Sequence, residues 1–200
     1  MARLFVGIGL PETYRQSLSP LTTSLSRLTD NCINWSRPDT WHLTLKFLGE
    51  TEEARIPAIK DALSTLDFPR FTLQAGGAGA FPNAQRPKVL WLGLAQGADQ
   101  AAGLASGIED ALAAVGVPRE QKRFRPHLTL GRVRRPGPGN HQPLLDAAAQ
   151  TQWPPFTVNR FTLYQSTLAP TGATHTALAE FALAGRRGLR RLREGERGNF

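Results

Sequence analysis

The tetrapeptide HLTL occurs twice, at His42–Leu45 and His127–Leu130, and carries the residues best suited to chemistry. In a strand, successive side chains point to opposite faces, so each histidine shares a face with Thr44 or Thr129 while the leucines face a core. An imidazole pKa of about 6.5 lets one histidine take a proton from an attacking oxygen while the other protonates a leaving oxygen. Such a pair suits phosphoester chemistry, with threonine hydroxyls holding the non-bridging oxygens.

Two further matches in the same order indicate an internal duplication. RLFVGIGL at Arg3–Leu10 aligns with KVLWLGLA at Lys88–Ala95, and RFTL recurs at Arg70–Leu73 and Arg160–Leu163. A four-residue match alone is weak, but three matches in order are a strong sign of repetition. A single histidine in an apolar strand would be interpreted as a core residue bonded to a backbone carbonyl. Two histidines at duplicated positions favour a functional site.

Each half of the chain predicts the order β-α-β-α-β, which is typical of layered α/β folds. We expect one domain over residues 1–184, with pseudo-symmetric halves of about 1–85 and 86–184. The fold is predicted to be bilobal, with two facing sheets and a central cleft. The AGGAGA segment at Ala75–Ala80 follows a strand, as a dinucleotide-binding loop does, but Pro82 and Asn83 come after it instead of a helix, so it is interpreted as a surface loop. The expected helices cover about 11–27, 52–66, 98–115 and 142–150, and expected strands include 41–48, 127–133 and 174–183.

The net charge of +8 is concentrated in two segments. Residues 119–135 contain seven basic side chains and one acid, and residues 185–200 contain six arginines and two glutamates. Clustered positive charge attracts polyanions. The C-terminal segment has little apolar content, so we expect a solvated, flexible tail. The internal cluster surrounds the second HLTL segment and therefore flanks the expected cleft.

Composition excludes several classes of protein. The chain has 200 residues, of which 40% are hydrophobic and 20% charged, as in a globular protein. No apolar run approaches the ~20 residues needed to span a bilayer. The single cysteine, Cys32, cannot form an internal disulfide and fits a reducing compartment, so we expect a cytoplasmic protein. We also expect it to be a monomer. No metal or other cofactor is expected, because the motif histidines lack carboxylates or cysteines at ligand spacing.

The two histidine segments also carry a family resemblance. HLTLKFLGE after Trp41 and FRPHLTLGR at Phe124–Arg132 resemble the twin H-x-T-x signatures of the 2H phosphoesterases. More narrowly, they resemble the RNA 2′,3′-cyclic phosphodiesterases of bacteria and archaea, also called 2′-5′ RNA ligases. The similarity covers about residues 2–183. It implies a metal-independent hydrolysis of terminal 2′,3′-cyclic phosphates to 2′-phosphates, with reversible 2′-5′ ligation as a side activity.

The same resemblance assigns roles to residues. It implies that His42 is the acid at the 3′ oxygen, and that His127 is the base directed toward water. Thr44 and Thr129 are expected on the phosphate. Arg132 matches the arginine that follows the second motif in this family, and is expected to contact the phosphate as well.

Phe47 completes the list of candidate site residues, and two further histidines are interpreted as lying outside it. Phe47 lies five residues after His42, as Arg132 lies five residues after His127, so Phe47 is expected to contact the substrate. His141 and His175 have no counterpart in the other half and are interpreted as surface residues. In many relatives a tyrosine stands where this chain has His175.

Two alternatives stay open. The same mechanism can act on 2′-5′-linked oligonucleotides or a small cyclic nucleotide, or the chain can be a non-catalytic RNA-binding module that relies on its basic cluster. Turnover of a nucleoside 2′,3′-cyclic phosphate distinguishes the enzyme from the binding module, because a binding module gives affinity without product.

Overall fold

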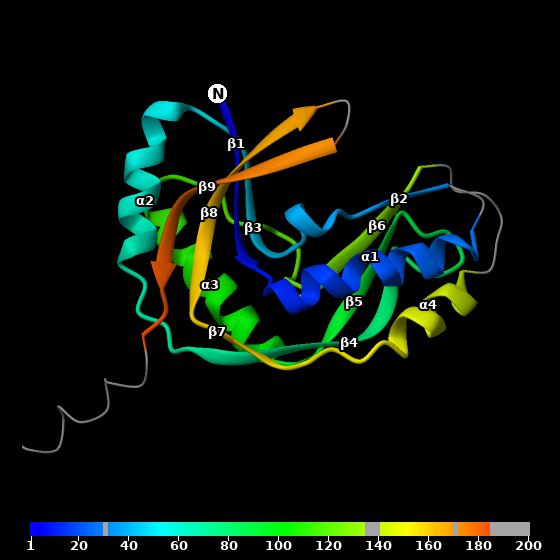
Figure 1. The fold of residues 1–200 in the computed structure, drawn as a ribbon. Coiled ribbons are helices and arrows are strands. Elements are labelled where there is room, and N and C mark those ends of the chain that lie inside the picture. The colour runs from blue at the N-terminus through cyan, green and yellow to red at the C-terminus, as the bar shows by residue number, and fades with distance from the viewer. Residues whose placement is uncertain (30–31, 135–140, 170–171, 185–200) are drawn as a thin grey trace, which may run out of the picture.

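The structure is a computed structural model that describes residues 1–29, 32–134, 141–169 and 172–184 (Figure 1). The predicted tail of residues 185–200 lies outside the described residues, as does Arg135 of the basic cluster. The elements are β1 (Ala2–Gly9), α1 (Glu12–Ser26), β2 (Ile33–Trp35), η1 (Pro38–Thr40), β3 (His42–Thr51), η2 (Glu53–Arg55), α2 (Ile56–Ser64), β4 (Phe71–Phe81), β5 (Val89–Gln96), α3 (Ala98–Ala114), β6 (Leu128–Val133), α4 (Gln142–Ala149), β7 (Phe156–Val158), β8 (Arg160–Ala169) and β9 (Gly172–Ala182).

The helices and strands predicted from the sequence are present, with small differences at their ends. The interpretation of Ala75–Ala80 as a surface loop is wrong, because β4 runs through this segment and pairs with β5. The glycines allow close packing of the two strands. A Cβ atom at Gly79 would lie 2.3 Å from the ring of Trp91, so only glycine leaves room for this indole across the strand.

The strands form one continuous sheet in the order β7-β4-β5-β6-β3-β1-β8-β9, with β2 added beside β6. The α/β class and the duplicated arrangement agree with the sequence prediction. The two sheets that the sequence predicts are halves of this one sheet. They join where β3 meets β6, at the antiparallel pair Leu43 and Leu128.

The two repeats exchange strands between the halves of the sheet. β4 ends the first repeat but pairs with β5 of the second, and β8 of the second repeat pairs with β1 of the first. The helices follow the same exchange: α2 packs with α3, which covers β3, whereas α1 packs with α4, which covers β4 and β5 (Figure 1). Each half of the sheet is therefore built from both repeats.

Apolar residues at helical spacing attach the helices to the sheet. Leu104, Ile108 and Leu112 of α3 are fully buried, as is Leu18 of α1. Among the described residues, no helix is long and apolar enough to cross a membrane.

Candidate active site

The two HLT segments lie side by side at the junction of the half-sheets. Leu43 pairs with Leu128, and both leucines are fully buried. Antiparallel register then places His42 opposite Thr129, and Thr44 opposite His127, on the other face of the sheet from the leucines. Four polar side chains are thus gathered around one backbone pair.

All six residues singled out from the sequence line one cavity of about 410 Å³, which we call the histidine cavity. The β8–β9 hairpin contributes one wall of it through residues such as Ser166 and His175. Phe47 stands at its mouth with 62% of its surface exposed. The six residues are His42, Thr44, Phe47, His127, Thr129 and Arg132.

Two β-bulges explain why residues at an odd spacing share a face with the histidines. On β3, Thr44 pairs with Gly7 and Lys46 with Val6, so Leu45 is the extra residue. On β6 the register shift likewise leaves Leu130 unpaired. One extra residue reverses the alternation of side chains. Phe47 and Arg132, five residues after their histidines, are therefore returned to the cavity face.

Backbone carbonyls fix the tautomer of both imidazoles. Nδ1 of His42 donates to the Thr40 carbonyl oxygen at 2.7 Å, and Nδ1 of His127 donates to the Arg125 carbonyl oxygen at 2.7 Å. A carbonyl accepts only, so Nδ1 carries the proton in each ring and Nε2 is left to exchange protons. Nε2 of His42 accepts from the Thr44 hydroxyl at 2.9 Å.

Burial lowers the pKa of His42 to about 4, against the opposing effect of its hydrogen bond to Thr40. The neighbouring charges of His175, Arg132 and His127 lower this pKa further. Burial also lowers the pKa of His127, again opposed by a backbone hydrogen bond and assisted by Arg132. Both histidines of the free protein are therefore neutral at pH 7, and the positive surroundings favour an anionic ligand.

A hydrogen bond couples the two motifs directly. The indole Nε1 of Trp41, next to His42, donates to the Thr129 carbonyl oxygen at 2.9 Å. Ser36 Oγ donates to the same oxygen at 2.7 Å, and the Ser36 amide donates to the Leu130 carbonyl at 2.8 Å. These donors satisfy the backbone carbonyls of Thr129 and Leu130. They also hold the first motif in register with the second.

Aromatic rings fix the orientation of each imidazole. The ring of His42 stacks on Phe5 at a centroid distance of 4.6 Å. His127 meets the edge of Phe81 at 5.0 Å, and Phe81 in turn packs on Trp91 at 5.1 Å. Gly7 leaves the space for His42, because a Cβ there would approach its ring to 3.4 Å and the Leu43 carbonyl oxygen to 2.9 Å.

The interpretation of His175 as a surface residue is wrong, because its side chain is partly buried against His42. Its ring lies edge-on to His42 at 5.1 Å and to Phe5 at 4.9 Å, and it lines the histidine cavity. Burial lowers the pKa of His175, with Asp39 opposing the shift. The sequence signal that could have placed His175 in the site was its correspondence with a tyrosine of many relatives. His175 has no duplicated copy that could have indicated its role. It lies on β9, and the strand at the matching outer position of the other half-sheet is β7, which has only three residues.

In the part of the chain that the structure describes, no three His, Cys, Asp or Glu side chains gather as metal ligands would. Asp39 is the carboxylate that raises the pKa of His175, and it forms an ion pair with Arg37 at 2.7 Å. The cavity therefore offers imidazoles, hydroxyls and a guanidinium, a set that suits a phosphate group and proton transfer.

Comparison with known proteins agrees with this geometry. The sequence model described as "LigT like Phosphoesterase" matches residues 8–91 and, a second time, residues 92–175. Among curated proteins, the RNA 2′,3′-cyclic phosphodiesterase of Archaeoglobus fulgidus is 32% identical over 179 residues, covering 90% of this chain and 99% of the relative. The RNA 2′,3′-cyclic phosphodiesterase of Thermus thermophilus is 36% identical over 196 residues, covering 93% and 92%.

The chain belongs to the LigT-like phosphoesterase family, and each of its repeats matches the family separately. Among solved structures, E. coli LigT complexed with 3′-AMP superposes with a TM-score of 0.73 at 29% identity, covering 92% of this chain and 98% of LigT. A crystal structure of a Thermus thermophilus protein gives the same TM-score, 0.73, at 29% identity, with 92% and 99% covered.

Proposed function

We propose that the protein hydrolyses the 2′,3′-cyclic phosphate at the end of an RNA strand to a 2′-phosphate. The observation that carries this proposal is the pair of imidazoles at one backbone junction, each with Nδ1 held by a carbonyl and Nε2 available for proton transfer. The names of the similar curated proteins support the choice of substrate.

In the proposed reaction, Nε2 of His127 takes a proton from water as the water oxygen bonds to phosphorus. The bond between phosphorus and the 3′ oxygen breaks, and Nε2 of His42, which takes up a proton from solvent once the anionic phosphate is bound, gives that proton to the 3′ oxygen. The products are a 2′-phosphate and a 3′-hydroxyl. Thr44, Thr129 and Arg132 bind the non-bridging oxygens, where charge accumulates in the transition state. No step requires a metal ion or another cofactor.

The order of the two histidines is the one that the family resemblance implies. Nε2 of His127 is consistent with it, because it has no hydrogen bond among the described residues and is open to a water molecule. Replacing water by the 5′-hydroxyl of a second RNA strand would give a 2′-5′ linkage with the same proton transfers. We include this ligation as a side activity.

The experiment measures turnover of a nucleoside 2′,3′-cyclic phosphate and of its analogue with sulfur in place of the 3′ bridging oxygen, both with EDTA present. Sulfur leaves without protonation, so the analogue should restore activity to His42→Ala and not to His127→Ala. The reverse pattern would exchange the two roles. No turnover by the wild-type protein would refute the enzymatic proposal and favour an RNA-binding module.

We further infer that the protein acts as a monomer in the cytoplasm. Both histidine motifs belong to one chain and meet within it, so the site is complete without a partner. The single cysteine suits a reducing compartment. Light scattering at assay concentrations, together with activity per chain, tests the oligomeric state.

A further inference from the structure

A second cavity of about 780 Å³ adjoins the histidine cavity, and we call it the basic cavity. It lies between α3 and the loop that precedes β6. Thr44, Phe47 and His127 line both cavities, so the two form one continuous depression. All the residues that the proposed reaction uses line the histidine cavity, and the walls of the basic cavity beyond Thr44, Phe47 and His127 have no role in that reaction.

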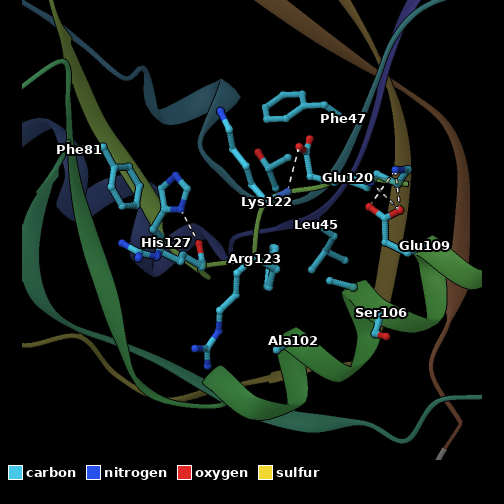
Figure 2. Close-up of a pocket in the computed structure, with 15 residues that line it drawn as sticks. Leu45, Phe47, Phe81, Ala102, Ser106, Glu109, Glu120, Lys122, Arg123 and His127 are labelled. Atoms are coloured by element: carbon cyan, nitrogen blue, oxygen red, sulfur yellow. Dashed lines mark hydrogen bonds and ion pairs between the residues drawn. The ribbon is translucent and has the colours of Figure 1, made fainter. Parts of the chain in front are cut away.

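One wall of the basic cavity is formed by α3. Figure 2 shows Ala102, Ser106 and Glu109 in succession along this helix, facing the cavity. Leu45 and Phe81 add apolar surface, and Phe81 stands beside His127 (Figure 2). Single-stranded nucleic acids bind to grooves of this composition, where bases meet apolar or aromatic surface and cations follow the phosphates.

The opposite wall carries the positive charge. Lys122, Arg123 and Arg125 are exposed and line the cavity, and the side chains of Lys122 and Arg123 extend from the loop in opposite directions (Figure 2). Two exposed cations spaced along one groove suit successive phosphodiesters better than a single compact anion. Both belong to the basic cluster predicted from the sequence, and the proposed chemistry uses neither of them.

One of the two acids that line the basic cavity in the described part of the chain, Glu109, is neutralised. Nζ of Lys46, whose side chain is only 3% exposed, donates to both carboxylate oxygens of Glu109 at 2.8 Å. Glu109 therefore presents little net charge to a ligand. Among the described residues that line the cavity, the carboxylate of Glu120 alone offsets the three cations, and it accepts the backbone amide of Lys122 at 3.5 Å.

The same ion pair anchors the loop. Nζ of Lys46 also donates to the Pro118 carbonyl oxygen at 2.9 Å, and Glu109 accepts the Glu120 amide at 3.3 Å. At the other end of the loop, the Arg125 carbonyl oxygen accepts a hydrogen bond from Nδ1 of His127. The segment carrying the cations is thus fixed at both ends, and its second anchor is the histidine that we place at the reacting phosphate.

We propose that the basic cavity is a subsite for the RNA strand preceding the terminal cyclic phosphate, and that Lys122 and Arg123 bind its phosphodiesters. The proposal rests on the proposed function, since it places the strand relative to the reacting end. It makes an RNA oligonucleotide, and not a mononucleotide, the preferred substrate.

The test compares a nucleoside 2′,3′-cyclic phosphate with a short single-stranded RNA that ends in the same cyclic nucleotide. Wild-type protein, Lys122→Ala, Arg123→Ala and the double variant are assayed for kcat/KM at several salt concentrations. Lys60→Ala is the matched control, because Lys60 lies on α2 and lines neither cavity. Binding of the RNA product, which ends in a 2′-phosphate, is measured in parallel by fluorescence anisotropy.

We expect each substitution to lower kcat/KM for the RNA about 10-fold while the mononucleotide value stays unchanged, since phosphate contacts act on the longer ligand alone. The slope of log affinity against log salt should fall by about 0.7 per lost contact. Unchanged mononucleotide kinetics also show that the variants are folded. Lys60→Ala should behave as wild type with both ligands.

Equal losses on both substrates would overturn the subsite, as would a double variant that matches Lys60→Ala in binding the RNA product. A wild-type protein without preference for RNA would also contradict it. Absence of turnover with both substrates refutes the proposed function instead. In that case the anisotropy measurement still decides whether Lys122 and Arg123 bind the strand.

Discussion

The pKa of His42 should rise strongly when a phosphate occupies the histidine cavity. In the free protein, burial lowers this pKa to about 4 from an ordinary value of 6.5. The difference corresponds to about 3 kcal/mol, and leaves roughly one imidazole in a thousand protonated at pH 7. A general acid in this state would be ineffective, so the substrate itself must supply the missing stabilisation of the imidazolium.

The charge of the phosphate is sufficient for this purpose. A monoanion about 4 Å from the imidazolium, at an effective dielectric constant of about 20, contributes about 4 kcal/mol, or about three pKa units. The sign is favourable, because the anion stabilises the protonated ring whereas burial, Arg132 and His175 destabilise it. We therefore expect a pKa of about 7 for His42 in the complex, which suits an acid at neutral pH.

Nuclear magnetic resonance titration of the His42 Cε1–H signal measures both values. The signal is assigned with His42→Asn, and the titration is repeated with a nucleoside 2′-phosphate and with the nucleoside alone as the control. In the kinetics, the alkaline limb of kcat/KM should lie at lower pH than that of kcat, since the former reports the free enzyme. Titration near pH 6.5 without ligand, or no upward shift with the 2′-phosphate, would refute the reasoning.

Three further outcomes are expected. His42→Ala and His127→Ala should each lower kcat about 10²–10⁴-fold in steady-state assays, and near-wild-type kcat in either would contradict the twin-histidine mechanism. Because the pKa of folded His42 is depressed, the unfolded chain binds more protons below pH 6.5. Between pH 7 and pH 4 the wild type should lose about 3 kcal/mol more stability than His42→Asn in urea unfolding, and parallel curves would exclude the shift. Lys46→Met should cost about 3–5 kcal/mol by leaving the Glu109 carboxylate unpaired, and Lys46→Met with Glu109→Gln should recover part of this loss; identical stabilities would show that the pair is not buried in solution.

Most of the secondary structure could be predicted because it follows from local patterns. Leu104, Ile108 and Leu112 recur at helical spacing and form the buried face of α3. The segment Ala75–Ala80 was misassigned because glycine-rich composition is typical of loops. Only the position of Trp91, whose indole crosses β4 at Gly79, shows why glycines belong in this strand.

The candidate site could be predicted to the extent that it was duplicated. Repetition distinguishes His42 and His127 from ordinary core histidines, and the matched spacing associates Phe47 with Arg132. His175 had no such copy. It reaches His42 through the register of β9 on β8 and of β8 on β1, and long-range strand pairing of this kind leaves no periodic signal in the sequence.

The residue types of the candidate site and their approximate twofold relation follow from local sequence, because the repeated HLTL segments form equivalent strands. Tertiary structure alone decided that these strands meet at Leu43 and Leu128, and that repeats exchange strands so that each half-sheet contains both. It also decided the bulges at Leu45 and Leu130, since an extra residue is defined only against the partner strand. The depressed pKa of His42 likewise depends on burial and on charges from distant parts of the chain, which have no expression in local sequence.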